Sequence, residues 1–275
     1  AKGSFFLNDE IRPSENLTLN FGIRADYYRL LSIPWTDDFT NTTALPVFAS
    51  NYDLQGARSG MRPKFPIAIS PRFGFTYKIP EENVVIRGGM GIFTGRIPLV
   101  WPGGIFNNNG IFQSGYTANS SQNVAAWNQI RFRANPFQQW LPSEVGISTS
   151  KGGLNLISEE FRMPQLFRTS LAIDKKFNNG WNMTLEGLYS QNISEIYYTN
   201  INIRQPQGVS TGAGARTVYP VPVTLPIVGT SNPYDNAILL TNNSGPKGFA
   251  YNLAATVSKR TRDGFFFEAN YSFGN

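Results

Sequence analysis

The sequence predicts an all-β protein, a transmembrane antiparallel β-barrel, from three observations. Apolar and polar side chains alternate along segments of about 9–12 residues, the length that crosses a bilayer at a tilt. Short turns alternate with long loops. The 275 residues are 14% aromatic and only 15% charged, and the mean hydropathy is −0.25, whereas about a quarter of the residues in a soluble protein are charged.

The clearest alternation runs from Leu17 to Tyr28. Phe21 falls on the apolar side of this segment and Arg24 on the polar side, because successive side chains of a strand point to opposite faces. The same period of two marks seven further segments that we expect to form strands, namely 5–12, 71–78, 86–93, 167–174, 181–190, 251–258 and 265–273.

The connections between these strands are of two kinds that alternate strictly. The short ones, rich in the turn-forming residues Pro, Asn, Asp and Gly, are 13–16, 80–83, 178–180 and 261–264. The long ones lie at about 29–69, 96–164 and 199–247. All turns should therefore share one rim of the barrel and all loops the other, as in outer-membrane barrels with short periplasmic turns and long extracellular loops.

The residue types present exclude several functions. The chain has no Cys and no His, which rules out a Ser-His-Asp triad, an HExxH metalloprotease site, a thiolate metal site and a His-ligated haem within it. The net charge of +6 is spread along the chain, so we expect no nucleic-acid partner. No apolar run has the length of a transmembrane helix. We therefore expect no enzyme, cofactor or metal site.

Five segments resemble TonB-dependent receptors, the plugged outer-membrane transporters of Gram-negative bacteria, and within them the Oar-like group. They are NDEIRP (8–13), NLTLNFGIRAD (16–26), SPRFGF (70–75), IRGGMGIF (86–93) and the final hairpin (248–273). The resemblance implies a barrel of about 22 strands, a plug domain, a TonB complex that supplies energy, and uptake of a substrate bound at the cell surface. For the Oar-like group it implies a peptide or protein substrate; glycans and metal chelates stay open.

With eight predicted strands and no plug, we expect residues 1–275 to be a partial barrel domain, an internal section of a larger transporter. The alternative is a complete small barrel that acts as an anchor or adhesin through its loops, since eight strands can close. Segments 5–12 and 265–273 would then pair with each other. A barrel enzyme is a third reading, disfavoured by the missing histidine.

Two groups of residues are candidates for function. Charged side chains on the polar side of the strands would hold the plug or guide an anionic substrate: Arg24, Asp26, Arg72, Arg87, Arg168, Glu186 and Glu268. The alternative is a hydrated interior with charges paired across strands. Aromatic side chains of the largest loop would contact an extracellular ligand, or else pack the loop against its neighbours: Trp101, Phe106, Tyr116, Trp127 and Trp140.

Overall fold

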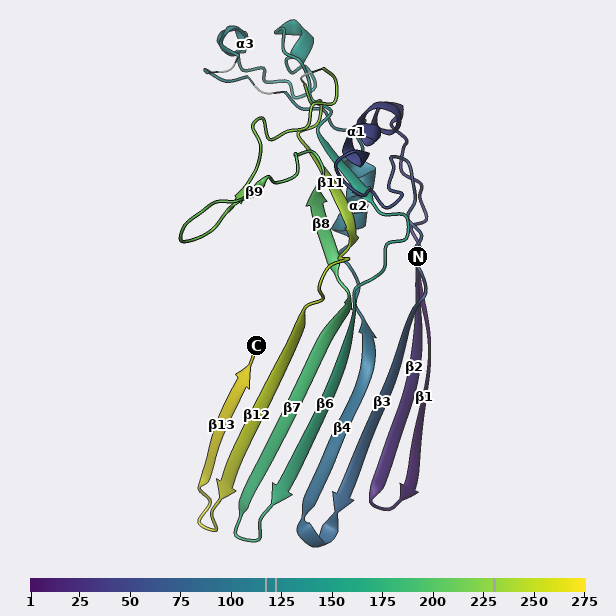
Figure 1. The fold of residues 1–275 in the computed structure, drawn as a ribbon, viewed down its shortest axis with the longest axis vertical. Coiled ribbons are helices and arrows are strands. Elements are labelled where there is room, and N and C mark those ends of the chain that lie inside the picture. Colours follow the sequence, from purple (N-terminus) through teal and green to yellow (C-terminus); the bar gives the residue numbers. More distant parts are fainter. Residues whose placement is uncertain (117, 122, 230) are drawn as a thin grey trace.

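The computed structural model describes residues 1–116, 118–121, 123–229 and 231–275. A tall antiparallel sheet forms its lower part (Figure 1), with eight strands in the order β1-β2-β3-β4-β6-β7-β12-β13. The strands are β1 Lys2–Ser14, β2 Leu17–Tyr28, β3 Ala68–Ile79, β4 Val84–Thr94, β6 Gln165–Lys176, β7 Trp181–Ser194, β12 Phe249–Arg260 and β13 Phe266–Gly274. All eight predicted strands are confirmed; β2 has its predicted bounds and the others are extended or displaced by a few residues.

The two rims are also as expected. Short turns join the strands at the lower end of the sheet and the three long connections leave its upper end (Figure 1). The turn between β3 and β4 contains a 3-10 helix, Pro80–Glu82, and closes at Asn83 with a φ of 50°. Gly180 closes the next turn at a φ of 84°, where a Cβ would lie 2.9 Å from the carbonyl oxygen of Arg260. Only glycine fits such a position without strain.

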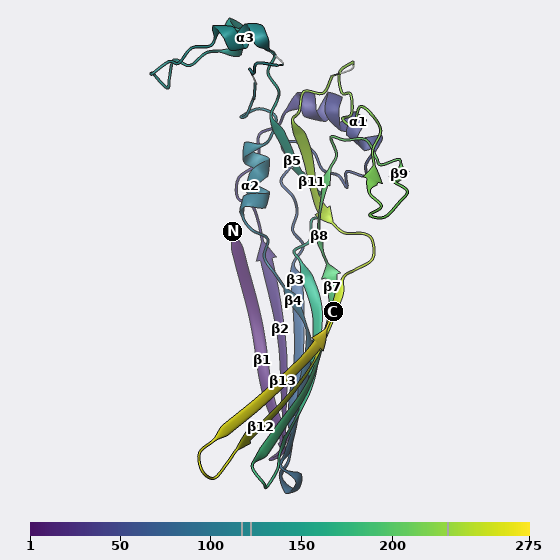
Figure 2. The ribbon, with the colours of Figure 1, turned by 90° about the vertical axis from the view of Figure 1, so that its left-hand side faces the viewer.

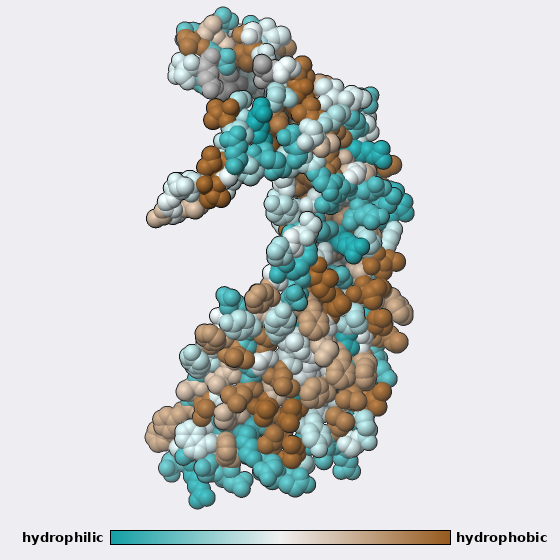
Figure 3. Space-filling view, in the orientation of Figure 1, coloured by the Kyte–Doolittle hydropathy of each residue, from teal (hydrophilic) through white to brown (hydrophobic). Residues whose placement is uncertain are grey.

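The sheet has an apolar face and a polar face, and the register fixes which residues lie on each. Phe21 pairs with Phe73, whose next partner is Met90, and the Phe21 and Phe73 rings lie 5.2 Å apart. Leu171 belongs to this apolar face and is 52% exposed. Apolar side chains gather over the strands, while polar ones gather over the turns below (Figure 3). A bilayer would cover such a face.

The sheet is open. β1 and β13 form its two edges, and no pairing joins them in the part of the chain that the structure describes. The alternative of a closed eight-stranded barrel, with 5–12 paired to 265–273, is therefore wrong for this fold. Six other strands separate these two edges. Each edge strand therefore has a neighbour on one side alone within the described residues, and its outer backbone N–H and C=O groups have no strand to pair with.

The long connections, expected as loops, fold together into a structure that we call the loop cap (residues 29–67, 95–164 and 195–248). Its centre is a three-stranded sheet in the order β5-β11-β8, made of β5 Gly153–Ile157, β11 Asn236–Asn242 and β8 Ile196–Asn200. β11 pairs with β5 in parallel and with β8 in antiparallel fashion. Each strand comes from a different part of the chain, so the pairing is not local.

Helices cover both sides of this small sheet. α1 (Leu45–Ala49), which follows the π-helix Thr40–Ala44, and α2 (Val100–Asn107) lie on opposite sides of β5 and β11 (Figure 2). The α1 side holds a core that includes Phe48, Leu154 and Leu239. The α2 side holds a second core, whose members include Ile97, Ile105, Ile157, Phe161 and Leu240. Burial of these apolar side chains is the main force that orders the cap.

The remaining elements of the cap are short. They are α3 Val124–Gln129, the 3-10 helix Pro142–Glu144, β9 Gly208–Val209 and β10 Thr217–Val218. β9 and β10 pair in a hairpin that projects sideways from the cap (Figure 1). Among the described residues, no helix has the length and hydrophobicity that crossing a bilayer requires.

A buried polar network links the cap segments. The Thr40 hydroxyl lies 2.6 Å from a carboxylate oxygen of Asp37 and 2.7 Å from the hydroxyl of Tyr234. Lys151 Nζ lies 3.2 Å from the same carboxylate, and Asn202 donates to the Tyr234 carbonyl. Burial raises the pKa of Tyr234 to about 12, so its hydroxyl stays neutral. Buried polar groups with partners specify one arrangement of the segments around them.

Glu195 joins the cap to the top of the large sheet, immediately after β7. Its carboxylate accepts hydrogen bonds from the side-chain amides of Asn243 and Asn192 and from the backbone N–H of Gly248. These bonds lower the pKa of Glu195, because they favour the charged carboxylate. The bonds tie the end of β7 to the segment that leads into β12.

Candidate functional site

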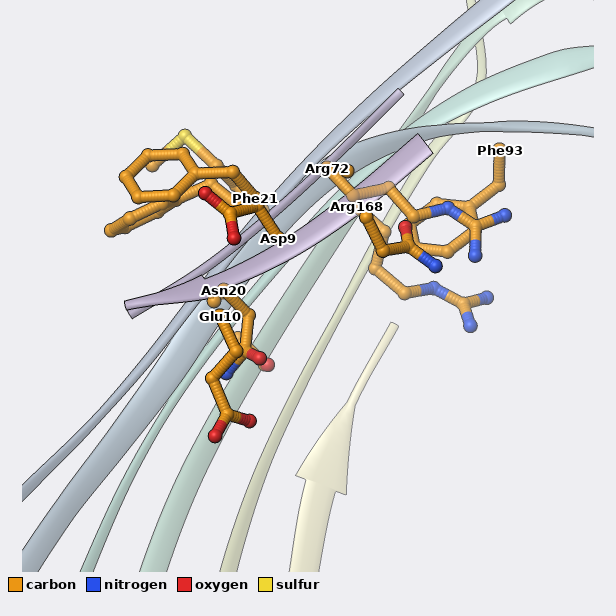
Figure 4. Close-up of a pocket in the computed structure, with 14 residues that line it drawn as sticks. Asp9, Glu10, Asn20, Phe21, Arg72, Phe93 and Arg168 are labelled. Atoms are coloured by element: carbon orange, nitrogen blue, oxygen red, sulfur yellow. The ribbon is translucent and has the colours of Figure 1, made fainter. Parts of the chain in front are cut away.

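Two arginines of the polar face lie in one row across three strands. Arg72 of β3 and Arg168 of β6 both pair with Gly91 of β4, which lies between them. Neighbouring strands are about 4.8 Å apart, so the two Cα atoms lie about 10 Å apart. Gly91 has no side chain to fill the gap. Figure 4 shows the two guanidinium groups together on one side of the strands, beside Phe93.

Small residues form the floor next to these arginines. Gly74, Gly89 and Ser170 make the adjacent row of the polar face. A hollow of about 540 Å³ lies here, and its other polar-face walls are Asn8, Glu10, Asn20, Gly22 and Phe93. Asp9 and Phe21 also border the hollow, but they lie on the opposite face of the sheet (Figure 4).

A Cβ on Gly89 would lie 2.7 Å from the carbonyl oxygen of Phe73. The backbone itself thus excludes a larger residue there. This close approach is one of the uses that glycine has inside a strand, and it keeps the floor of the hollow flat.

Neither arginine of the row has a carboxylate partner among the residues that the structure describes. The Arg72 guanidinium lies 4.6 Å from the centre of the Phe93 ring, and a cation above an aromatic face is held by the ring quadrupole. Arg168 forms no ion pair within the same described residues. Asp26 lies close enough to Arg72 for the two charges to attract each other, and Glu10, which borders the hollow, is paired with Arg12. The two guanidinium groups, which form no ion pair of their own in the described residues, can bind a carboxylate or another oxyanion by charge-assisted hydrogen bonds.

The other predicted charges of the polar face are paired. Arg24 donates to both carboxylate oxygens of Asp26, at 2.8 and 2.9 Å. Arg87 lies 2.9 Å from Asp174 and 3.9 Å from Glu186. The pairs of Arg87 join different strands, as the alternative to a functional role predicts, whereas Arg24 and Asp26 pair within β2.

Glu268 of β13 lies on the polar face, where it accepts a hydrogen bond from Asn270 at 3.0 Å. The register puts it in a row with Ser258 and Asn182, far from the arginine row. The seven predicted residues therefore share a face, yet only Arg72 and Arg168 meet at one site. Their role toward a plug or a substrate stays a prediction.

The aromatic residues predicted from the largest loop separate into two places. Tyr116, Trp127 and Trp140 line a hollow of about 470 Å³ near α3, together with Arg131 and Arg133. Trp101 and Phe106 belong instead to α2 and pack against the second core of the cap. Trp101 and Phe106 thus contribute to packing within the cap, and their role toward a ligand stays a prediction.

Hydrogen bonds fix the α3 hollow. The Tyr116 hydroxyl donates to the Trp140 carbonyl, and the Trp140 indole donates to the Arg131 carbonyl. Arg133 lies 3.8 Å from the centre of the Trp140 ring. The hydrogen bond from the backbone N–H of Leu141, together with the ion pair to Arg133, lowers the pKa of Glu144. These contacts hold the rings of Tyr116 and Trp140 in place, whereas the Phe132 side chain at the edge of the hollow is 93% exposed.

The sequence reasoning missed several site residues. In the alternation of segment 86–93, Phe93 falls on the polar side. Its presence on the same face as Arg72 could therefore have been predicted from the period of two. Gly89 and Gly91 stand out in the sequence as part of a glycine run within a strand. The place of Gly91 between the arginines, and of Gly89 in the adjacent row, depends on the register. No group of His, Cys, Asp and Glu that could hold a metal ion occurs within the described ranges.

The antiparallel sheet is open and has one apolar face, one polar face and two unequal rims. Its strands have the length that crosses a membrane. These features define a section of a transmembrane β-barrel. The chain belongs to the outer membrane beta barrel domain family, whose model matches residues 2–275. It is therefore a protein of the outer membrane of a Gram-negative bacterium. A comparison with curated proteins finds no match.

The fold is also similar to parts of solved structures. The siderophore receptor PirA from Pseudomonas aeruginosa is 12% identical with a TM-score of 0.49, over 100% of this chain and 34% of that one. PirA from Acinetobacter baumannii is 11% identical with a TM-score of 0.47, over 99% and 27%. The FrpB iron transporter from Neisseria meningitidis is 11% identical with a TM-score of 0.37, over 99% and 36%. The chain spans about a third of the length of these proteins.

Proposed function

We propose that residues 1–275 are a partial barrel domain within a TonB-dependent outer-membrane transporter of the Oar-like group. The sequence resemblance supports this, and the open sheet agrees with it. Unpaired backbone groups at a sheet edge cannot face lipid. Strands outside this chain would therefore continue the barrel at β1 and β13, toward about 22 strands.

In this proposal the polar face lines the lumen and the loop cap faces the cell exterior. The whole protein would bind its substrate at the cap and pass it through the barrel as its plug rearranges, with energy from the TonB complex. A peptide or protein is the proposed substrate. No catalytic step is proposed for any residue of the chain.

The observation that carries the proposal is the row formed by Arg72, Gly91 and Arg168. A purely structural lumen would pair its charges, as Arg24 and Arg87 are paired. This row instead leaves two cations above a floor of small residues. The proposed occupant is a carboxylate, either of the plug at rest or of an acidic peptide in passage. The α3 hollow, where Arg133 lies against Trp140, would make an earlier contact at the surface.

The test uses the full-length protein that contains this chain, produced in the outer membrane of cells without other peptide channels. Uptake of radiolabelled triglutamate is measured with and without a protonophore. We expect energy-dependent uptake that falls by at least about 10- to 100-fold in the double variant Arg72→Ala/Arg168→Ala, because the loss of even one charge-assisted hydrogen bond costs about 1.5–3 kcal/mol.

The matched control is Lys78→Ala, which removes one cation of the polar face near the turns and should leave uptake unchanged. Barrel assembly is checked by heat-modifiable migration of each variant in a gel. Energy-dependent uptake that the double variant does not reduce would contradict the arginine row as a substrate site. Uptake that ignores the protonophore, or no uptake at all, would contradict the transporter proposal for acidic peptides.

A further inference from the structure

The loop cap contains a second cleft, between α2 and the three-stranded sheet. Its volume is about 300 Å³. The sheet presents two rows of side chains to it: Ile238 lies beside Asn155 in one, and Leu240 lies between Ile157 and Tyr198 in the other. α2 forms the opposite wall with Trp101 and Gly104. The cleft lies at the loop end of the barrel, away from the arginine row.

Gly104 lets α2 approach the sheet closely. A Cβ at this position would lie 2.2 Å from the side-chain nitrogen of Asn155, so a larger residue would push this amide aside. The absence of a side chain on the helix therefore makes room for the amide on the sheet, although glycine weakens a helix interior.

Four amide side chains border the cleft, those of Asn107, Asn108, Gln113 and Asn155. None of them has a hydrogen-bond partner among the residues that the structure describes, although the backbone of Asn155 bonds to that of Asn108. Each amide offers both donors and an acceptor. A ligand hydroxyl also donates and accepts, so amides and hydroxyls match in either direction.

The cleft combines these amides with aromatic rings and carries no charge. Trp101 and Tyr198 meet edge to face, with ring centres 5.0 Å apart and planes at 89°. No Asp, Glu, Lys or Arg lines the cleft within the described part of the chain. Ligand sites typically pair apolar and aromatic walls with a few placed polar groups. The lack of charge disfavours an anion here, in contrast to the arginine row.

We propose that this cleft binds a neutral, polyhydroxylated ligand, the chemistry that a sugar unit of a glycan presents. Hydroxyl groups would bond to the amides of Asn155 and Gln113, and the C–H face of the ring would pack on Trp101. The volume is at the lower end of the range of about 300–1,000 Å³ for small-molecule sites, which suits a short unit rather than an extended peptide. The proposal concerns the cap alone and does not depend on transport.

Binding is measured on the purified full-length protein, without energisation, by isothermal titration and by tryptophan fluorescence. The probes are maltohexaose, cellohexaose and mannohexaose, with trialanine and triglutamate for comparison. We expect at least one oligosaccharide to bind, with little change as ionic strength is raised. Asn155→Leu keeps the size of the side chain but removes its amide, and should weaken binding about tenfold.

Gln113→Ala is a second variant, because this exposed side chain can be lost without disturbing the fold; it should also weaken binding. Gln207→Ala removes an exposed amide of the cap outside this cleft and serves as the matched control with unchanged affinity. The proposal is overturned if no oligosaccharide binds, if trialanine binds more tightly than every oligosaccharide, or if Asn155→Leu and Gln113→Ala bind the oligosaccharide like the wild type. Because no transport is involved, its failure is distinct from failure of the uptake experiment.

Discussion

Phe48→Ala is expected to destabilise the loop cap by about 3–5 kcal/mol, the usual cost of truncating a buried Phe. The Phe48 side chain is fully buried, and its ring lies 6.3 Å from that of Tyr234. Its loss leaves a cavity between α1 and the three-stranded sheet. Because the large sheet has its own hydrogen-bonded ladder, the cap should open while the barrel stays folded.

Limited trypsin digestion of the full-length protein in vesicles measures this opening. The variant should be cut in the cap much faster than the wild type, whereas the heat-modifiable migration of the barrel should not change. Phe132→Ala is the matched control, since it truncates the same residue type where the ring is 93% exposed. Equal digestion rates for wild type and Phe48→Ala would show that the three long connections do not form one core.

Leu171→Arg is expected to destabilise the barrel by about 2–4 kcal/mol, the cost of an arginine on the lipid face near the bilayer midplane. Leu171 lies near the middle of β6 on the apolar face. Ser170 is its neighbour at almost the same depth, but it lies on the polar face. Ser170→Arg should therefore cost much less, because its guanidinium would remain in water.

Urea unfolding of the full-length protein in lipid vesicles compares these two variants with the wild type. The difference between them is the informative quantity, since both add the same side chain to the same strand. Equal losses of stability, or a larger loss for Ser170→Arg, would contradict the assignment of the two faces.

The strands could be predicted because their signal is local. In β2 every residue from Leu17 to Tyr28 alternates between apolar and polar positions, so both its bounds and its faces follow from the period of two. The first residues of some strands could not be predicted in this way. β1 begins at Lys2 and β3 at Ala68, outside the clean alternation, because hydrogen bonding to a neighbour extends a strand beyond its patterned residues.

The loop cap could not be predicted, because its order depends on contacts between distant segments. β5 has only five residues and pairs with β11, although β6 and β7 of the large sheet lie between the two in the sequence. Asn236–Asn242 contains an apolar run, but such a run does not name its partner. The cap helices are too short for a helical period to be recognised.

The candidate site shows the same division. The alternation of β3 and β6 is enough to place Arg72 and Arg168 on the polar face. That both pair with Gly91 depends on the register across β4, and the largest loop separates β4 from β6 in the sequence. Likewise, the sequence alone does not distinguish the roles of Trp101 and Trp140, which are both aromatic residues of the largest loop. In the structure, Trp101 belongs to α2 and packs against the second core of the cap.

The most direct test of the central assignment, that this sheet spans the outer membrane with its polar face toward water, is a spin-label scan along β6. The chain contains no cysteine, so single cysteines at positions 166 to 173 can be labelled in the full-length protein in lipid vesicles. We predict that labels at 167, 169, 171 and 173 collide with oxygen dissolved in lipid, while those at 166, 168, 170 and 172 collide with a water-soluble nickel complex. An alternation of opposite phase, or uniform exposure of all eight positions to water, would contradict it.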